Sequence, residues 1–351
     1  MTCRRLTISK LGVVLLCLFW GGWQFAWGQI GGFAAYNALA LPAGGKVAGI
    51  GGVNVSAYGP DAFSFWQNPA MGRADEMNRA GLSYNPYSGL FKNTNVSGVF
   101  AAKGYDFGAG LSYITYGSLA GHDAQGNAKG DFSATEYAFR GNASTAQGPF
   151  RLGATLVFAG QAVAGYTSNA LGVDLGGLYS HPTKDLKVGL TIKNIGGVVK
   201  KLTPDLPGGT LPLNIALGTS YKFEHMPLRI SATLQQLQKW DIVFQDPTIS
   251  VKTNADGTEE PLDKKFADKA FRHLVVGGEF VFSKSFHLRF GYNHLARKEL
   301  RMVLGPSGGA GFALGTMIKI KRITFDYTHS FGHVAGGSNF LGLAYDFGKK
   351  N

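Results

Sequence analysis

Strict two-residue alternation constrains this chain more than any other feature of its sequence. Apolar side chains alternate with small or polar ones in many segments, such as 152–158, 186–192 and 312–320. This period is typical of β-strands that have one apolar face and one polar face. Fourteen such segments are predicted as strands: 79–90, 94–103, 105–116, 130–142, 149–160, 168–180, 184–195, 211–223, 226–238, 272–283, 285–295, 309–320, 322–331 and 338–347.

The connections between these strands alternate in length. Tight turns are expected around residues 104, 181–183, 224–225, 284 and 321. Longer loops are expected at 117–129, 196–210, 239–271 and 296–308. Short turns at one rim and longer loops at the other are typical of membrane barrels, and the length of these strands suits a tilted bilayer crossing. Since only a closed barrel leaves no unpaired strand edge in lipid, the sequence predicts a 14-stranded antiparallel transmembrane β-barrel over residues 79–351.

The first 28 residues have the pattern of a secretory signal peptide. Basic residues Arg4, Arg5 and Lys10 precede an apolar run over 11–20, and the small residues around 26–28 suit cleavage. We therefore expect a mature chain that begins near residue 29, is exported, and crosses the outer membrane many times.

Both cysteines, Cys3 and Cys17, lie within this predicted signal peptide. The exported protein is therefore expected to contain no disulfide and no cysteine metal ligand. A lipoprotein signal ending at Cys17 is an alternative, but the residue before a lipidated cysteine is small and Leu16 is not.

The composition indicates a chain that faces lipid more than water. Charged residues make up 16% of the sequence, against a typical value of about 25%, and 51 of the 351 residues are glycine. The formal net charge is +12. An exported protein is not expected to meet nucleic acid, so we expect the anionic partner to be lipopolysaccharide phosphate or an acidic glycan. Basic residues that merely face anionic lipid headgroups are the plain alternative.

Two segments depart from the alternating pattern. Residues 29–78 are rich in glycine and turn-forming residues, which predicts a compact plug or hatch segment ahead of the barrel. The loop 239–271 is the longest connection, and its charged stretch 263–269 is expected to form a short helix over the outer mouth. Disorder is the alternative for this loop.

No catalytic motif is present in the sequence. The chain contains no Walker loop, no His-Glu-x-x-His and no Gly-x-Ser-x-Gly, and its histidines are scattered singly. We therefore expect no enzyme activity, no cofactor and no metal site.

One cluster of residues is a candidate for anion binding. His294 precedes a basic loop that contains Arg297, Lys298 and Arg301. These residues are expected at one mouth of the barrel, where they would contact lipopolysaccharide phosphate or a protein partner. The alternative is that basic loops beside anionic lipid need no specific ligand.

The N-terminal segment carries a resemblance to a known family. Ala40-Leu41-Pro42, the stretch 46–55 with Gly-Gly-Val-Asn-Val, Asp61, and the block Phe65-Trp66-Gln67-Asn68-Pro69-Ala70 lead into the first strand. This pattern resembles the PorV/PorQ family of FadL-like outer-membrane barrels, and most of all its PorQ-like members from the type IX secretion system. The resemblance implies a fourteen-stranded barrel with an N-terminal segment inside it.

The resemblance also implies a function. By this resemblance, the barrel is expected to anchor a PorZ-like surface protein and to help present anionic lipopolysaccharide to a PorU/PorV-type attachment complex. The partner surface would lie on the long loops 196–210, 239–271 and 296–308. A FadL-like transporter of hydrophobic compounds is the main alternative, and it would need a continuous apolar path through the lumen. A barrel-wall hydrolase and a soluble β-sandwich are less favoured, because no nucleophile and base pair can be placed and the strands are long.

Overall fold

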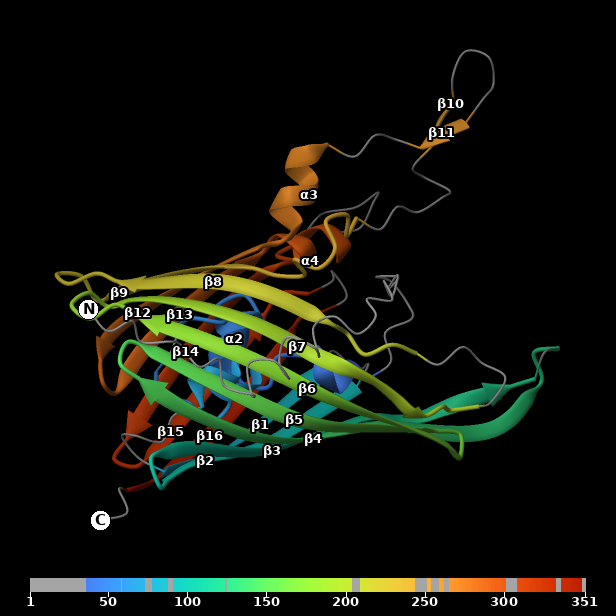
Figure 1. Cartoon of the computed structure of the whole chain (residues 1–351). Helices are drawn as coiled ribbons and strands as arrows, with labels where there is room; N and C mark the ends of the chain where they lie inside the picture. The colour runs from blue at the N-terminus through green and yellow to red at the C-terminus, as the bar shows by residue number, and fades with distance from the viewer. Residues whose placement is uncertain are drawn as a thin grey trace, which may run out of the picture.

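The computed structural model describes residues 36–57, 59–72, 78–87, 91–123, 125–203, 209–243, 251–253, 259–261, 265–300, 308–332 and 336–348. Fourteen strands close into a single antiparallel barrel (Figure 1), which confirms the predicted fold class. Closure is made by β1 (Asn78–Tyr87) and β16 (Ser338–Gly348), which pair antiparallel, for example Ser83 with Gly342. The predicted signal peptide lies outside the described residues.

The remaining barrel strands follow in chain order. They are β2 (Phe91–Ala102), β3 (Tyr105–His122), β4 (Ala128–Gln147), β5 (Phe150–Val163), β6 (Tyr166–Ser180), β7 (Leu186–Lys200), β8 (Asn214–Lys222), β9 (Leu228–Leu234), β12 (Leu274–Ser283), β13 (Phe286–Asn293), β14 (Phe312–Ile320) and β15 (Ile323–Ser330). Between β9 and β12, the short strands β10 (Val251–Thr253) and β11 (Glu259–Pro261) form a separate two-stranded sheet.

The two rims of the barrel differ as predicted. Connections such as 103–104, 284–285 and 321–322 lie at one end, here called the short-turn rim. The connections 235–273 and 294–311 lie at the opposite end, here called the long-loop rim. In Figure 1 the short-turn rim is on the left, and the helices α3 (Phe266–Arg272) and α4 (His294–Glu299) lie above the barrel.

One predicted loop and one predicted strand end are wrong in extent. Residues 117–129 were expected to form a loop, but β3 continues to His122 and β4 begins at Ala128. The predicted strand 130–142 ends too early, because β4 runs to Gln147 and turns directly into β5. These stretches are polar or small, so they lack the apolar alternation on which the prediction depended.

The ends of β3 and β4 extend beyond the rest of the barrel. The partner strand β2 pairs with β3 only as far as Thr115, and β5 pairs with β4 only from Ala134. Beyond these points Leu119 pairs with Phe132 in a two-stranded ribbon, the green extension on the right of Figure 1. The ribbon therefore offers unpaired backbone edges beyond the long-loop rim, which is a place where another chain can add a strand.

The outer face of the barrel is apolar and its inner face is polar. On β5, Leu152 and Leu156 are 65% and 70% exposed, whereas Thr155 between them is fully buried. Aromatic pairs such as Phe282 with Phe286 and Tyr345 with Phe347 lie near the short-turn rim. An apolar band with aromatic residues at its edge is the outer surface of a membrane barrel.

The helices in the described residues are all too short, or not apolar enough, to span a bilayer.

The lipid-facing band predicts a strong effect of charge at its centre. Leu156 lies midway along β5 and points outward, so we expect Leu156→Arg to destabilise the folded barrel in lipid by about 2–4 kcal/mol. Met226→Arg is the matched control, because Met226 is exposed in the turn between β8 and β9 and should cost less than about 1 kcal/mol. Urea unfolding in phospholipid vesicles measures both, and equal costs for the two variants would place Leu156 outside the bilayer.

Candidate functional site

Residues 36–57 and 59–72, here called the lumen segment, pack inside the barrel. They form three short 3-10 helices, η1 (Asn37–Leu39), η2 (Ser64–Trp66) and η3 (Pro69–Met71), and one α-helical turn, α2 (Gly45–Gly49). Figure 1 shows these elements in blue, enclosed by the strands. Their side chains are among the most buried of the chain, including Tyr36, Phe65 and Asn68 at 1% exposure or less.

Asn68 is the best-anchored residue of the lumen segment. Its side-chain amide donates hydrogen bonds to the carbonyl oxygens of Val55, at 2.8 Å, and Gly177 on β6, at 3.1 Å. Its Oδ1 accepts a hydrogen bond from the backbone N–H of Ala70 at 2.9 Å, which begins η3. The Asn-Pro-Ala sequence therefore fixes one end of the lumen segment to itself and to the barrel wall.

Trp66 fixes the neighbouring part of the lumen segment. Its indole N–H donates to Ser97 Oγ on β2 at 3.2 Å, and the Arg140 guanidinium of β4 lies over its ring, 4.6 Å from the centroid. The hydroxyl of Ser97 in turn donates to the Ala62 carbonyl at 2.6 Å. A buried tryptophan needs a hydrogen-bond acceptor for its indole N–H, and its ring face attracts cations. Ser97 and Arg140 supply these two contacts.

Wall glycines let the lumen segment approach the strands closely. A Cβ atom on Gly189 of β7 would overlap the Val55 carbonyl oxygen, and one on Gly153 of β5 would overlap the Pro69 carbonyl. Gly291 of β13 is covered in the same way by the backbone of Gly51. Only a residue without a side chain permits such contact between a strand and another backbone.

The lumen segment meets strands around almost the whole circumference. Ser144 on β4 donates to the Gly72 carbonyl at 2.8 Å, and Thr328 on β15 donates to the Gly45 carbonyl at 2.8 Å. Ser220 on β8 donates to the Ser56 carbonyl at 3.0 Å, and α2 also packs against β13, β14 and β16. A segment held from opposite walls at once lies across the lumen.

A buried charge cluster lines the lumen on the short-turn side. Glu279 of β12 accepts hydrogen bonds from Arg229 Nη1 at 2.7 Å and Arg289 Nε at 2.9 Å, and Arg289 also pairs with Asp326. Lys46 of α2 is 9% exposed and donates to the Gly59 carbonyl at 3.4 Å. Burial lowers the pKa of Lys46, while the carboxylates of Asp61 and Glu279 oppose this shift.

Two short helices form a cap at the long-loop rim. The helix α3 (Phe266–Arg272) packs against α4 (His294–Glu299), and their ion pairs meet at Asp268, which binds Arg272 at 2.8 Å and Lys298 at 3.0 Å. Burial tends to raise the pKa of Asp268, but these two cations lower it overall. The helix expected over residues 263–269 is present three residues later, and residues 262–264 lie outside the described part of the chain.

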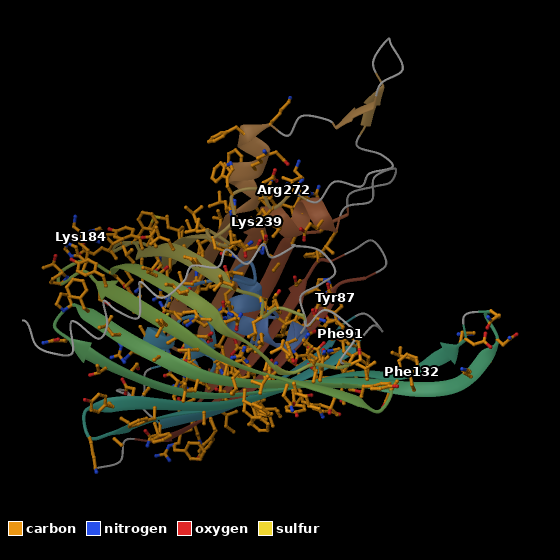
Figure 2. The ribbon with its side chains drawn as sticks, turned by 45° about the vertical axis from the view of Figure 1, so that its right-hand side comes forward. Tyr87, Phe91, Phe132, Lys184, Lys239 and Arg272 are labelled. Carbon is orange, nitrogen blue, oxygen red and sulfur yellow. The ribbon has the colours of Figure 1, made fainter. Side chains whose placement is uncertain are left out.

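The cap also includes Trp240, which packs beside α3, and it carries exposed aromatic side chains. Trp240 stacks on His273, with ring centroids 5.6 Å apart, and lies 5.3 Å from Phe266. Trp240 and Phe266 are 52% and 73% exposed. Figure 2 places the nearby Lys239 and Arg272 at this rim and Lys184 at the opposite end of the barrel. An exposed aromatic platform bordered by basic residues is a surface suited to a partner.

The candidate anion-binding residues lie on this cap, but their groups are engaged. Arg297 Nη1 donates to the carbonyl oxygens of Gly308 at 2.8 Å and Ala310 at 3.4 Å, and Lys298 pairs with Asp268. His294 Nδ1 hydrogen-bonds the Tyr292 hydroxyl at 2.8 Å, and burial followed by the Lys298 charge lowers the pKa of His294. Arg301 lies outside the described residues. The anion site at these positions stays a prediction.

An apolar hollow lies beside the cap on the lipid-facing side. It has a volume of about 520 Å³ and is lined mostly by Val276, Phe290, Phe312, Leu314 and Phe331. Three of these side chains, Phe290, Phe312 and Leu314, are 42–55% exposed.

Among the described residues, no group of histidine, cysteine and acidic side chains could hold a metal ion.

The sequence prediction missed the buried charge cluster around Glu279 and the exposed aromatic side chains of the cap. Glu279, Arg289 and Asp326 occupy inward positions on β12, β13 and β15, so their alternation with apolar residues marks them as lumen-facing. Alternation does not show which residues of neighbouring strands lie side by side, because that depends on the register between the strands. The ion pairs of Glu279 and Arg289 therefore could not be predicted. Trp240 and Phe266 lie in a loop, where periodicity gives no signal.

No protein-family model and no curated protein matches this chain. Solved structures do match it. The P. putida toluene transporter TodX is 13% identical, with 92% of this chain and 100% of that chain covered and a TM-score of 0.52. A deltaS2 mutant of the TodX monoaromatic hydrocarbon channel is 14% identical, with 89% and 100% covered and a TM-score of 0.56. At this identity the likeness shows the fold alone: the chain has a FadL-like barrel fold.

Proposed function

We propose that this chain is an outer-membrane barrel with a closed lumen that anchors a surface partner. The observation that carries the proposal is the seating of the lumen segment, which is hydrogen-bonded to β4, β6, β8 and β15 at the same time. A barrel filled in this way is a rigid support, and its function then lies in the loops that it holds.

The long-loop rim supplies the surface for the partner. Long loops of membrane barrels face the cell exterior. The cap of Trp240, α3 and α4 offers exposed aromatic side chains there, and the β3–β4 ribbon offers free backbone edges. Together with the N-terminal resemblance, this favours a type IX secretion role of the PorV/PorQ kind, with a PorZ-like surface protein and a PorU/PorV-type attachment complex as partners.

The apolar hollow supports a role in lipopolysaccharide presentation. Its lining residues Phe312 and Leu314 point outward next to the long-loop rim, where the outer leaflet of the membrane lies. An acyl chain in the hollow would place its phosphate-bearing head near the basic residues of α4. The proposed anion contacts are His294, Lys298, Arg297 and Arg301, with Arg297 also retaining its backbone bonds.

Affinity purification from detergent-solubilised outer membrane tests the anchor. We expect the tagged wild-type barrel to bring a large surface protein and lipopolysaccharide with it, and the double variant Trp240→Ala/Phe266→Ala to lose at least about 80% of that protein, because exposed aromatic residues dominate binding at interfaces. Phe347→Ala is the matched control, since Phe347 is 59% exposed at the opposite rim. Equal recovery of the surface protein with the double variant would contradict the proposal.

Transport of hydrophobic compounds is the second candidate function. The observation that favours it is the shared fold with TodX, a toluene transporter. A transporter requires a path past the lumen segment, whereas an anchor does not. Uptake of radiolabelled toluene into cells that express the chain distinguishes the two, and uptake well above that of cells without it would replace the anchor proposal.

A further inference from the structure

A small polar cavity lies between the lumen segment and the wall formed by β7 and β8. Its volume is about 130 Å³, and Leu39 and Val53 of the lumen segment form part of its lining. Across from them it is lined by Thr191 and Lys193 of β7 and by Gln235, which follows β9. The cavity is separate from the apolar hollow and from the rim cap.

A β-bulge places two consecutive polar residues of β7 at this cavity. The register between β6 and β7 shifts so that Val173 pairs with Ile195 while Leu175 pairs with Ile192. Asn194 takes a left-handed backbone conformation with φ of 61°, and both Lys193 and Asn194 are at least 91% buried. In a regular strand one of the two would face lipid, so the bulge brings a second polar group into the lumen.

The charges around the cavity do not balance. Within the part of the chain that the structure describes, Lys193 makes no hydrogen bond and no ion pair. The carboxylate of Asp174 interacts electrostatically with both Lys193 and Arg140, and its Oδ1 already accepts the Asn194 N–H at 2.6 Å. Two buried cations thus share one carboxylate. Such an excess of buried positive charge is costly without a further anion.

Further polar atoms at the cavity have no hydrogen-bond partner among the described residues. These buried atoms are the Thr191 hydroxyl, the Gln235 side-chain amide nitrogen, and the side-chain amide oxygens of Asn194 and Gln236. Each such group in a folded protein requires a ligand or a water molecule. The cavity has room for roughly four waters, but water supplies no negative charge to Lys193.

We propose that this cavity binds a small oxyanion, either a carboxylate or a phosphate group. The Lys193 ammonium supplies the charge, and the Thr191 hydroxyl and the Gln235 amide donate hydrogen bonds to its oxygens. The apolar lining by Leu39 and Val53 accommodates a short aliphatic part of the ligand. Because the ligand would touch both the lumen segment and the wall, its binding would hold the two together, whether the barrel is an anchor or a transporter.

Calorimetric titration of the detergent-purified full chain tests this site. Inorganic phosphate and butyrate are titrated separately, and we expect one of them to bind saturably with one site per barrel. Phosphate binding identifies a phosphate-bearing ligand, and butyrate binding identifies a carboxylate. Lys193→Gln should weaken binding about tenfold or more, because it removes the ammonium charge that Lys193 directs at the anion.

Two further variants keep the test decisive. Lys200→Gln is the matched control, because Lys200 lies on the same strand but is exposed at its end, and its binding should equal that of wild type. Thr191→Val preserves shape and breaks no hydrogen bond to any residue that the structure describes, so it should fold and weaken binding several-fold even where Lys193→Gln does not fold. Absence of saturable binding of either anion to wild type, or wild-type affinity in Thr191→Val, would overturn the proposal and leave the cavity as a water site.

Discussion

Asn68→Ala is expected to destabilise the folded protein by about 2–4 kcal/mol. The Asn68 side chain is fully buried and makes three hydrogen bonds that the substitution removes. It donates to the carbonyl oxygens of Val55 and Gly177, and it accepts from the N–H of Ala70. A buried hydrogen bond contributes about 0.5–1.5 kcal/mol, and an N-cap residue about 1 kcal/mol. Because the bond to Gly177 joins the lumen segment to β6, the loss should loosen that segment before the barrel opens.

Urea unfolding in vesicles and limited proteolysis measure this effect together. We expect the lumen segment of Asn68→Ala to be cleaved at least about tenfold faster than in wild type, while the barrel keeps its heat-modifiable gel mobility. Asn127→Ala is the control, because Asn127 lies in the exposed connection between β3 and β4 and its loss should cost within about 0.5 kcal/mol. Similar values for the two variants would mean that Asn68 does not hold the lumen segment.

Gly189→Val should displace the lumen segment from the wall. A Cβ atom at this position would overlap the carbonyl oxygen of Val55, and the overlapped atom is backbone, which cannot rotate away. Overpacking of a buried site costs about 1–3 kcal/mol and more where the neighbour cannot shift. Valine is otherwise favoured in strands, so the expected loss arises from this contact and not from strand propensity.

The same strand provides the control for this variant. Gly197 also lies on β7, but nothing lies within 4 Å of a Cβ atom built there, so Gly197→Val should be neutral or slightly stabilising. Ion conductance in planar bilayers reports displacement of the lumen segment. We expect Gly189→Val to open conducting states that wild type and Gly197→Val lack, whereas a Gly189→Val barrel as silent as wild type would show that the contact with Val55 does not close the lumen.

The barrel was predictable because its physical cause repeats along the chain. Lipid on one side and polar contacts on the other impose alternation on every strand that crosses the bilayer, as in Leu152, Leu156 and Thr155 of β5. Where that cause is absent the prediction was wrong. The ribbon at Leu119 and Phe132 lies beyond the neighbouring strands, and apart from this pair its residues are mostly polar or small, so no apolar alternation marks it as a strand.

The contacts inside the lumen were not predictable from the sequence. The Asn-Pro-Ala block stands out as a motif in the sequence, but the partner of Asn68 at Gly177 is 109 residues away. The oxyanion cavity depends on the bulge at Asn194, which shifts the register by a single residue. Long-range hydrogen bonds and bulges follow from how the strands align, and a local pattern does not specify that alignment.

A disulfide between the lumen segment and the wall tests the central claim, that the lumen is filled from within. A Cβ atom on Gly45 would lie 3.8 Å from Phe340 Cβ on β16, which is the usual separation across a disulfide, about 3.8 Å. The double variant G45C/F340C is made with Cys3→Ser and Cys17→Ser and oxidised in intact membranes. The control pair is G45C/L341C, because Leu341 is 51% exposed and faces outward. The account predicts an intramolecular cross-link in G45C/F340C and none in the control; two free thiols in G45C/F340C that both react with a maleimide would contradict it.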